Sequence, residues 1–110
     1  MIRIFISQPM GGKTEQQIRD EREAIELWCT STYPGCEIID SMIEDVPPSK
    51  NRPLTFLAKS LELLADADIA VFADGWGDAR GCRIEHTAAT DYGITTIEFS
   101  RDLKGKITTQ

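Results

Sequence analysis

Apolar residues are gathered in four short runs that are separated by longer amphipathic or polar stretches. The runs lie at residues 2–6 (IRIFI), 37–40 (EIID), 69–73 (IAVFA) and 94–99 (ITTIEF), and their β-branched and aromatic residues predict four strands. The third run is almost wholly apolar, which is typical of a strand covered on both faces of a parallel sheet. The last ten residues are polar and predict an edge strand or a tail.

Three amphipathic helices are expected between these runs, over residues 14–31, 54–65 and 80–92. Thr14 and Gln17 form the T-x-x-Q pattern of a capping box, which marks the start of the first helix. The apolar stripe of the second helix repeats at helical spacing and consists of Leu54, Leu57, Ala58, Leu61, Leu64 and Ala65.

The alternation of strands and helices predicts an α/β fold with a four- or five-stranded, mainly parallel sheet and right-handed crossovers. A chain of 110 residues has room for one such domain, which we expect to span residues 1–110. The first and third strands should be adjacent at the centre of the sheet. Ligands bind such open sheets beyond the carboxyl ends of the strands. We therefore expect the loops that follow these two strands, 7–13 and 74–81, to open onto one shared site.

Charge and cysteine usage narrow the class of protein. The net charge of −6 argues against a nucleic-acid partner, because contacts with phosphates need clustered lysine and arginine. Cys29, Cys36 and Cys82 form no C-x-x-C pair and are expected to be free thiols in a reducing compartment. No apolar segment approaches the roughly 20 residues of a transmembrane helix, and no leader pattern precedes the first strand. We expect a cytoplasmic protein with no membrane partner, no metal and no cofactor.

The segment ISQPMGGKT (residues 6–14) resembles a Walker A loop, G-x-x-x-x-G-K-[ST], and the apolar run before Asp74 resembles a Walker B strand. A nucleoside triphosphatase is therefore one interpretation. However, Ser7 stands in place of the first glycine, and Pro9 removes one of the backbone amides that would hold a phosphate. The chain is also short for the core of such an enzyme. We therefore expect that Lys13 does not coordinate phosphate.

Two interpretations remain open for Gly11 and Gly12. Both glycines could serve the geometry of the strand-to-helix turn alone. Alternatively, they allow a ligand to approach the backbone at the start of the first helix. There the free amides and the helix dipole favour an anion or a sugar hydroxyl.

Glu85 has an unusual position for a carboxylate, because helical spacing places it on the apolar face of the third helix. That face is formed by Glu85, Ala88, Ala89 and Tyr92. Near the start of a helix the dipole favours the ionised form, and a carboxylate in this environment could act as a nucleophile. The alternative is a structural glutamate that is paired with Arg80 or Arg83.

The aromatic residue Trp76 and the single histidine, His86, also lie in this region. Trp76 belongs to a glycine-rich loop and could either stack on a nucleobase or cover the hydrophobic core. His86 follows Glu85 directly, and adjacent helical positions point about 100° apart. We therefore expect His86 to face away from Glu85 and to be exposed or structural.

Three segments together resemble the nucleoside 2-deoxyribosyltransferase-like superfamily. They are the strand followed by SQPMGG, the apolar strand before ADGW, and the helix GCRIEHTAA. Within this superfamily the chain is most similar to a small branch with ISxPM and GW…GxxxE motifs, and the resemblance covers residues 2–99. It implies a flavodoxin-like three-layer sandwich that forms a homo-oligomer, often with residues of a neighbouring subunit completing the site.

The resemblance also implies a chemistry for Glu85. In the superfamily the matching glutamate attacks C1′ of a (deoxy)ribosyl group, displaces the base and forms a covalent glycosyl-enzyme, which another base or water then resolves. The two loops would bind the nucleoside or nucleotide. The residues implied in binding are Ser7, Met10, Gly11, Gly12, Asp74, Trp76, Gly77 and Gly81.

The chain departs from the characterised enzymes of this superfamily at one important position. They carry an aspartate in the helix before the third strand, which assists departure of the base or holds the sugar, and the matching residue here is Ser60. A second carboxylate of theirs falls near Ala79, beside Asp78. Serine cannot donate a proton as a carboxylic acid does, and such help is typically worth about 10²–10⁴-fold in rate.

Two functional hypotheses from different classes follow, and a third predicts no ligand. The leading hypothesis is cleavage or transfer at the N-glycosidic bond of a nucleoside or nucleoside monophosphate, with Glu85 as the nucleophile. The competing hypothesis is a non-catalytic module that binds a nucleotide-derived small molecule in the same pocket. The third hypothesis, a purely oligomeric scaffold, predicts that the chain binds no ligand. Release of free base over time distinguishes the first hypothesis from the other two.

Overall fold

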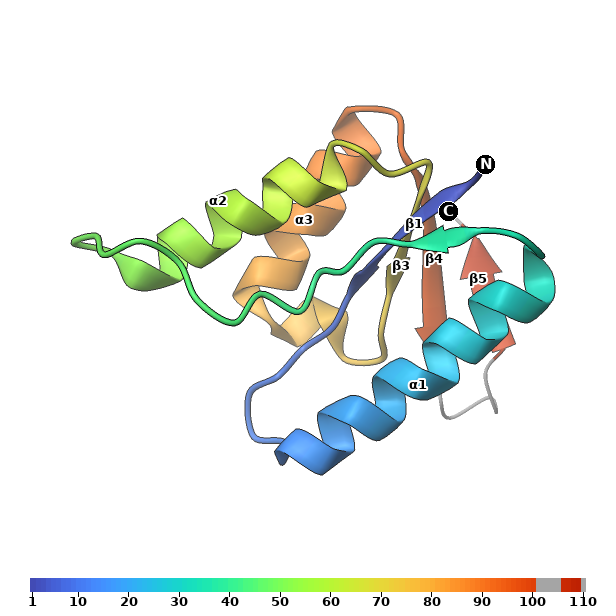
Figure 1. Cartoon of the computed structure of the whole chain (residues 1–110), viewed down its shortest axis with the longest axis horizontal. Coiled ribbons are helices and arrows are strands. Elements are labelled where there is room, and N and C mark those ends of the chain that lie inside the picture. The colour runs from blue at the N-terminus through green and yellow to red at the C-terminus, as the bar shows by residue number, and fades with distance from the viewer. Residues whose placement is uncertain (101–105, 110) are drawn as a thin grey trace.

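The computed structural model describes residues 1–100 and 106–109, which form an α/β fold (Figure 1). The five strands are β1 (Arg3–Ser7), β2 (Glu37–Ile38), β3 (Ile69–Phe72), β4 (Thr95–Ser100) and β5 (Lys106–Thr109). The three α-helices are α1 (Glu15–Thr32), α2 (Arg52–Leu64) and α3 (Arg80–Asp91), and a short 3₁₀-helix, η1 (Trp76–Asp78), precedes α3. The predicted four strands and three helices are all present.

A single sheet with the strand order β2-β1-β3-β4-β5 forms the middle layer. Strands β2, β1, β3 and β4 are parallel, whereas β5 runs antiparallel to β4 at the edge. The predicted adjacency of the first and third strands is confirmed, with Ile4 opposite Ile69 and Ser7 opposite Phe72. The last ten residues contribute the edge strand β5, while residues 101–105 and 110 lie outside the described part of the chain.

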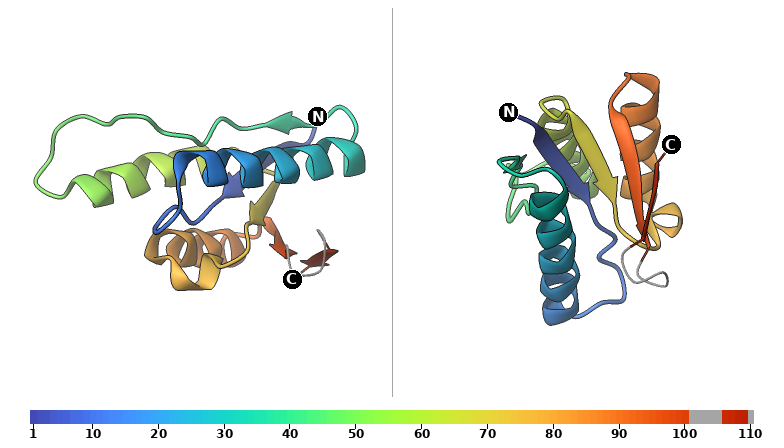
Figure 2. Two further views of the ribbon diagram at one scale, coloured as in Figure 1. Left: turned by 90° about the horizontal axis from the view of Figure 1, so that it is seen from below. Right: turned by 90° about the vertical axis from the view of Figure 1, so that its right-hand side faces the viewer.

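Helices cover both faces of the sheet, which makes the molecule a flavodoxin-like three-layer sandwich (Figure 2). Because successive strand residues point to opposite faces, each central strand contributes to two cores. Ile4 and Ile6 of β1 pack with Ile25 and Cys29 of α1 on one face. On the other face, Phe5 packs in a second cluster, with Leu64 of α2 and Ala89 of α3.

The capping of the first two helices agrees with their sequence patterns. Thr14 accepts a hydrogen bond from the backbone of Gln17, and the Gln17 side chain accepts one from the Thr14 backbone, which completes the predicted capping box. Asn51 caps α2 in a similar way by accepting a bond from the backbone of Leu54. These bonds occupy backbone amides that the first helical turn leaves free.

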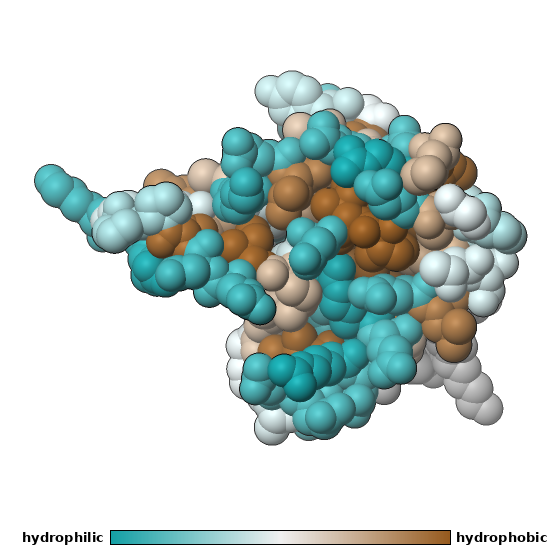
Figure 3. All heavy atoms as spheres, viewed as in Figure 1, coloured by the Kyte–Doolittle hydropathy of each residue, from teal (hydrophilic) through white to brown (hydrophobic). Residues whose placement is uncertain are grey.

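The predicted apolar stripe of α2 is wrong in its first half. Leu54 is 59% exposed and Ala58 is exposed, and only Leu64, at the end of the helix, is buried. The reason is that α2 extends beyond the edge of the sheet, so its first turns have no strand beneath them (Figure 1). Hydrophobic surface is visible among polar side chains over this projecting end (Figure 3). Tyr92, expected on the apolar face of the third helix, is likewise 86% exposed.

The loops after β1 and β3 open at the same edge of the sheet, as expected for adjacent parallel strands. They also approach each other closely, because a Cβ placed on Gly75 would lie 4.0 Å from the side chain of Pro9. Gly75 has a φ of 84°, in the left-handed region that glycine adopts without strain. In the described part of the chain, no helix is both long and apolar enough to cross a membrane.

The packing of α1 on the sheet can be tested with two substitutions two positions apart. Ile25 is fully buried, so Ile25→Ala leaves a cavity and should lower the free energy of unfolding by about 2–5 kcal/mol. Leu27 is 67% exposed, and Leu27→Ala should change it by no more than about 0.5 kcal/mol. Urea unfolding followed by circular dichroism measures both. Equal losses in the two variants would contradict the assigned face of α1.

Candidate active site

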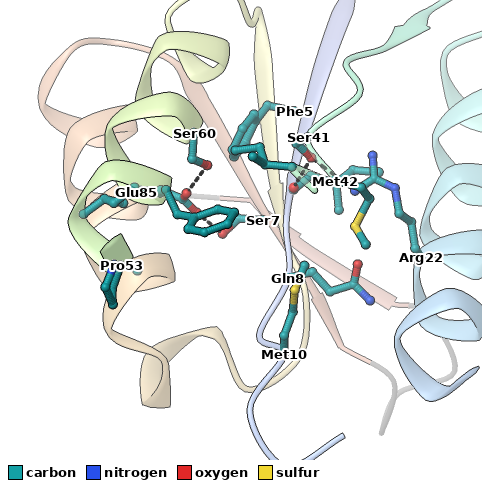
Figure 4. A pocket seen from close by; sticks show the side chains of 15 residues that line it. Phe5, Ser7, Gln8, Met10, Arg22, Ser41, Met42, Pro53, Ser60 and Glu85 are labelled. Atoms are coloured by element: carbon teal, nitrogen blue, oxygen red, sulfur yellow. Dashed lines mark hydrogen bonds between the residues drawn. The ribbon is translucent and has the colours of Figure 1, made fainter. Parts of the chain in front are cut away.

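A cavity of about 350 Å³ lies at the carboxyl end of β1 (Figure 4). Its lining comes from the end of β1 and the loop after it, from α1, from residues 41–43, from the first part of α2 and from the start of α3. The volume is within the range of about 300–1,000 Å³ that is usual for small-molecule sites. The cavity also lies where ligands bind open parallel sheets.

Glu85 of α3 lies in the wall of this cavity and is only 7% exposed. Both of its carboxylate oxygens accept hydrogen bonds from serine hydroxyls. Ser7 Oγ donates to Oε1 at 2.5 Å, and Ser60 Oγ donates to Oε2 (Figure 4). Within the described residues Glu85 forms no ion pair. Arg83 instead donates to the backbone carbonyl of Gly77, so the pairing with a neighbouring arginine does not occur.

Three elements bring these side chains together. Ser7 is the last residue of β1 and shares the orientation of Phe5, toward the face that α2 and α3 cover. Ser60 lies on α2, which packs against α3, so its hydroxyl reaches Glu85 from the opposite side. Ser60, which the sequence resemblance matched to an aspartate, is therefore in direct contact with Glu85.

The protonation of Glu85 reflects opposing effects. Burial removes water from the carboxylate and raises its pKa above the usual value of 4.5, while the hydrogen bonds from Ser60 and Ser7 stabilise the charged form and lower it. Burial is the largest of these effects, and the net shift is upward. Desolvation therefore acts against the ionised form that the start of the helix was expected to favour, and the expected ionisation of Glu85 stays a prediction.

Cys82, one turn before Glu85, is buried beside the same serine. Burial raises the pKa of its thiol, and the nearby Glu85 carboxylate raises it further, whereas a hydrogen bond with Ser7 lowers it. A thiol with a raised pKa is a poor nucleophile. Cys29 is buried as well, with a pKa of about 12, and all three cysteines are free, as predicted.

Lys13, from the Walker-like segment, turns away from the site and pairs with a buried carboxylate. Its ammonium donates to Glu21 of α1 at 3.1 Å, and the Glu21 side chain is only 4% exposed. Gln8 donates to the same carboxylate at 3.0 Å. The lysine therefore fastens the loop after β1 to the first helix. That it does not coordinate phosphate stays a prediction.

Arg22, a buried cation of α1, reaches the other side of the cavity. Its guanidinium donates to Glu26, to the hydroxyl of Ser41 and to the backbone carbonyl of Ile39. Ser41 in turn donates to the carbonyl of Ile6 at the end of β1. Arg22 thus connects α1, β1 and the segment after β2 while its side chain lines the cavity.

The structure brings four of the predicted site residues together in the cavity wall. They are Ser7, Met10, Gly81 and Glu85. Five other residues implied in binding do not line this cavity, namely Gly11, Gly12, Asp74, Trp76 and Gly77. Gly12 has a φ of 75°, so the turn before α1 requires its left-handed conformation, which agrees with the geometric interpretation of this glycine.

Trp76 covers the hydrophobic core rather than the cavity. Its ring stacks on His86 with centroids 4.0 Å apart and planes 11° from parallel, and its indole nitrogen donates to Glu98 at 2.9 Å. His86 also contacts the edge of Phe72. These contacts give His86 the structural position expected of it, directed away from Glu85. Asp78 and Ala79, next to the expected second carboxylate position, do not line the cavity either.

Sequence reasoning missed Gln8 and Arg22, which line the cavity from the side of α1. Gln8 follows a strand directly and Arg22 occupies a helix rich in charged residues, so neither stood out by spacing. Helical spacing was the one feature of the sequence that could have identified Arg22. It lies one turn after Ile18 and three positions before Ile25, on the side of α1 that faces the sheet.

Comparison with known protein families, curated proteins and solved structures finds no match for this chain.

The pairing of Lys13 with Glu21 generates a test of the Walker-like segment. Lys13→Ala leaves a buried carboxylate without its cation and should lower the free energy of unfolding by about 1–3 kcal/mol. The matched variant Lys50→Ala changes an exposed lysine and should be neutral. In titration calorimetry, magnesium-ATP should bind no better than about 1 mM to the wild type. Tight, magnesium-dependent binding that disappears in Lys13→Ala would contradict this assignment.

The raised pKa of Glu85 predicts a pH-dependent stability. Folding is favoured while the side chain is protonated, and this contribution is lost as the pH rises through the raised pKa of the folded state. Glu85→Gln stays neutral, so its free energy of unfolding relative to wild type should increase as the pH rises above the usual glutamate pKa of 4.5. Urea unfolding at several pH values measures the difference. Glu23→Gln, at an exposed position of α1, is the control, and an equal slope in both variants would refute the effect.

Proposed function

We propose that the chain catalyses cleavage or transfer at the N-glycosidic bond of a nucleoside or nucleoside monophosphate, with Glu85 as the nucleophile. The observation that supports this most is the buried Glu85 carboxylate, which faces a cavity of suitable size and is held by two serine hydroxyls. A buried carboxylate costs free energy, so a structural role alone is a poor reason to place it there. The resemblance to the nucleoside 2-deoxyribosyltransferase-like superfamily supports the same chemistry.

In the proposed reaction, one Glu85 oxygen attacks C1′ of the sugar while the bond from C1′ to the base breaks. The negative carboxylate stabilises the positive charge that develops on the sugar ring in the transition state. The hydroxyls of Ser7 and Ser60 keep the carboxylate in one orientation, which lowers the entropic cost of reaching a reactive geometry. The attacking oxygen exchanges its serine hydrogen bond for the bond to C1′. Water or a second base then releases the sugar from Glu85.

A second candidate, a non-catalytic module that binds a nucleotide-derived molecule, is favoured by the state of the carboxylate. Its pKa is raised, and both of its oxygens are already engaged by hydroxyls. Glu85 is also the only carboxylate among the described residues that line the cavity. A site that had kept its pocket but lost its proton donor would bind a nucleotide without cleaving it.

The proposal includes two further properties, which rest on the resemblance to the superfamily. The chain would form a homo-oligomer, and it would act in the cytoplasm on a small-molecule substrate. The projecting first turns of α2, with Leu54 exposed, border the cavity wall at Pro53 and Leu57 and offer surface for a second subunit.

The enzymatic proposal predicts a specific loss in Glu85→Gln. The substitution keeps the size of the side chain but removes the nucleophilic charge, so release of base should fall by at least about 10³-fold while ligand binding persists. Chromatography of reactions with nucleosides and their monophosphates measures release. Glu23→Gln, on the exposed side of α1, should retain wild-type activity.

A covalent adduct gives an independent readout of the same prediction. A 2′-fluoro nucleoside analogue slows breakdown of the glycosyl-enzyme, so intact-mass measurement of the wild type should show a sugar adduct, and peptide mapping should place it on Glu85. Undiminished release by Glu85→Gln would show that Glu85 is not the nucleophile. Tight binding without release from any substrate would favour the binding module instead.

A further inference from the structure

The cavity has two chemically different ends. Ser7 is the last residue of β1 and Gln8 follows it directly, and the bonds of their side chains show that they point to opposite faces of the sheet. Ser7 points toward Glu85, whereas Gln8 points toward α1 (Figure 4). Both line the same cavity, which therefore reaches across the carboxyl edge of the sheet. A ligand whose sugar lies against Glu85 can place its base at the end near Gln8 and Arg22.

Among the described residues, the side-chain oxygen of Gln8 is a hydrogen-bond acceptor without a partner. The amide nitrogen donates to the Ile18 carbonyl at 2.7 Å and to Glu21 at 3.0 Å, and these two acceptors determine which end of the amide is nitrogen. Gln8 is only 8% exposed, and within the described residues its Oε1 receives no hydrogen bond. A buried acceptor left in this state costs free energy. An N–H group of a ligand would recover that free energy once the side chains that cover the oxygen move aside.

Arg22 supplies the complementary donor at the same end of the cavity. A guanidinium has five N–H donors, and three are used by Glu26, Ser41 and the Ile39 carbonyl. Within the described residues the other two N–H groups have no acceptor, so an acceptor on a ligand could bond to them. Met10 and Met42 line the same cavity, and their flexible thioethers can move aside for a planar ring and pack against it.

This combination suits a carboxamide better than a phosphate. A carboxamide offers an N–H group for Gln8 and a carbonyl oxygen for Arg22. An ionised phosphate has no donor for Gln8, and two carboxylates, Glu21 and Glu26, already bond to Gln8 and Arg22. The added negative charge of a phosphate would be repelled by both of them.

The reactive end of the cavity restricts the leaving group independently. A neutral purine or pyrimidine leaves as an anion unless an acid protonates it, and Glu85 is the only carboxylate among the described cavity residues. A pyridinium ring needs no such acid, because it leaves as a neutral pyridine. Resting on the proposed function, we propose that the substrate is a pyridinium nucleoside or nucleotide with a ring carboxamide, of which the nicotinamide compounds are the simplest.

The step is balanced without a proton donor. A Glu85 oxygen forms a bond to C1′ while the C1′–N bond breaks, and its electron pair goes to the ring nitrogen, which changes from cationic to neutral. Water then attacks C1′, the ester bond to Glu85 breaks and one proton is released to solvent. The products are neutral nicotinamide, the free sugar and a proton, and the carboxylate is restored.

The test compares leaving groups on one sugar. Wild-type protein is incubated with nicotinamide riboside, inosine and uridine, and with their 5′-monophosphates, and release of base is followed by chromatography against reactions without protein. The kcat/KM for the nicotinamide compounds should exceed that for the neutral nucleosides by about 10²-fold or more, which is the usual contribution of the acid that this site lacks. Equal or faster release from inosine or uridine overturns the inference.

The recognition end is tested by binding, in a Glu85→Gln background so that no turnover occurs. Adding Gln8→Met removes the acceptor together with the bonds that the amide donates to Ile18 and Glu21. It should raise the Kd for nicotinamide mononucleotide by about tenfold and leave that for ribose 5-phosphate unchanged. Gln16→Met is the matched control, because this glutamine is exposed on α1 and bonds only to Asp20. Equal losses for both ligands, or no loss for either, would exclude Gln8 from base recognition.

The outcomes separate this inference from the function on which it rests. Release from inosine or uridine that depends on Glu85 keeps the proposed function and rejects the pyridinium substrate. Release that is insensitive to Glu85→Gln, or the absence of release from every compound, rejects both. If Gln8→Met does not fold, the comparison of leaving groups still decides the matter with the wild-type protein alone.

Discussion

Burial of the Glu85 carboxylate is the constraint around which one side of the molecule is organised. A charge away from water is tolerated only where donors surround it, and here the donors are Ser7 at the end of β1 and Ser60 in the middle of α2. Both hydroxyls reach the carboxylate only if α2 and α3 pack on the same face of the sheet, with Ser60 and Glu85 level with the carboxyl end of β1. The packing that forms the core thereby also orients the reactive group.

A second set of polar contacts organises the opposite face. Lys13 and Gln8 both bond to Glu21, which fastens the loop after β1 to α1. Arg22 bonds to Ser41, which bonds to the carbonyl of Ile6, and this connects the segment after β2 to the same helix. The cavity lies between the hydrogen bonds of Glu85 and those of Glu21 and Arg22. The elements that form its walls are therefore fixed by polar contacts on both faces of the sheet.

The architecture was predictable because it depends on periodic patterns and on local bonds. Apolar runs of strand length, helical spacing of apolar residues and the Thr14 capping box each act over a few residues, and the elements that they predict are all present in the structure. The errors occur where burial depends on distant neighbours. Leu54 and Tyr92 have the right helical spacing for a core face, but the sheet does not extend beneath Leu54, and Tyr92 lies beyond the last turn of α3.

The sequence by itself determined the fold class, the shared edge of the two loops and the unusual position of Glu85 on an apolar helix face. Only the tertiary structure decided which side chains meet there. Ser7 and Glu85 are 78 residues apart, and Ser60 and Glu85 are 25 apart, distances over which no local pattern operates. Burial likewise decided the direction of the Glu85 pKa shift, because desolvation depends on everything packed around a group rather than on its place along a helix.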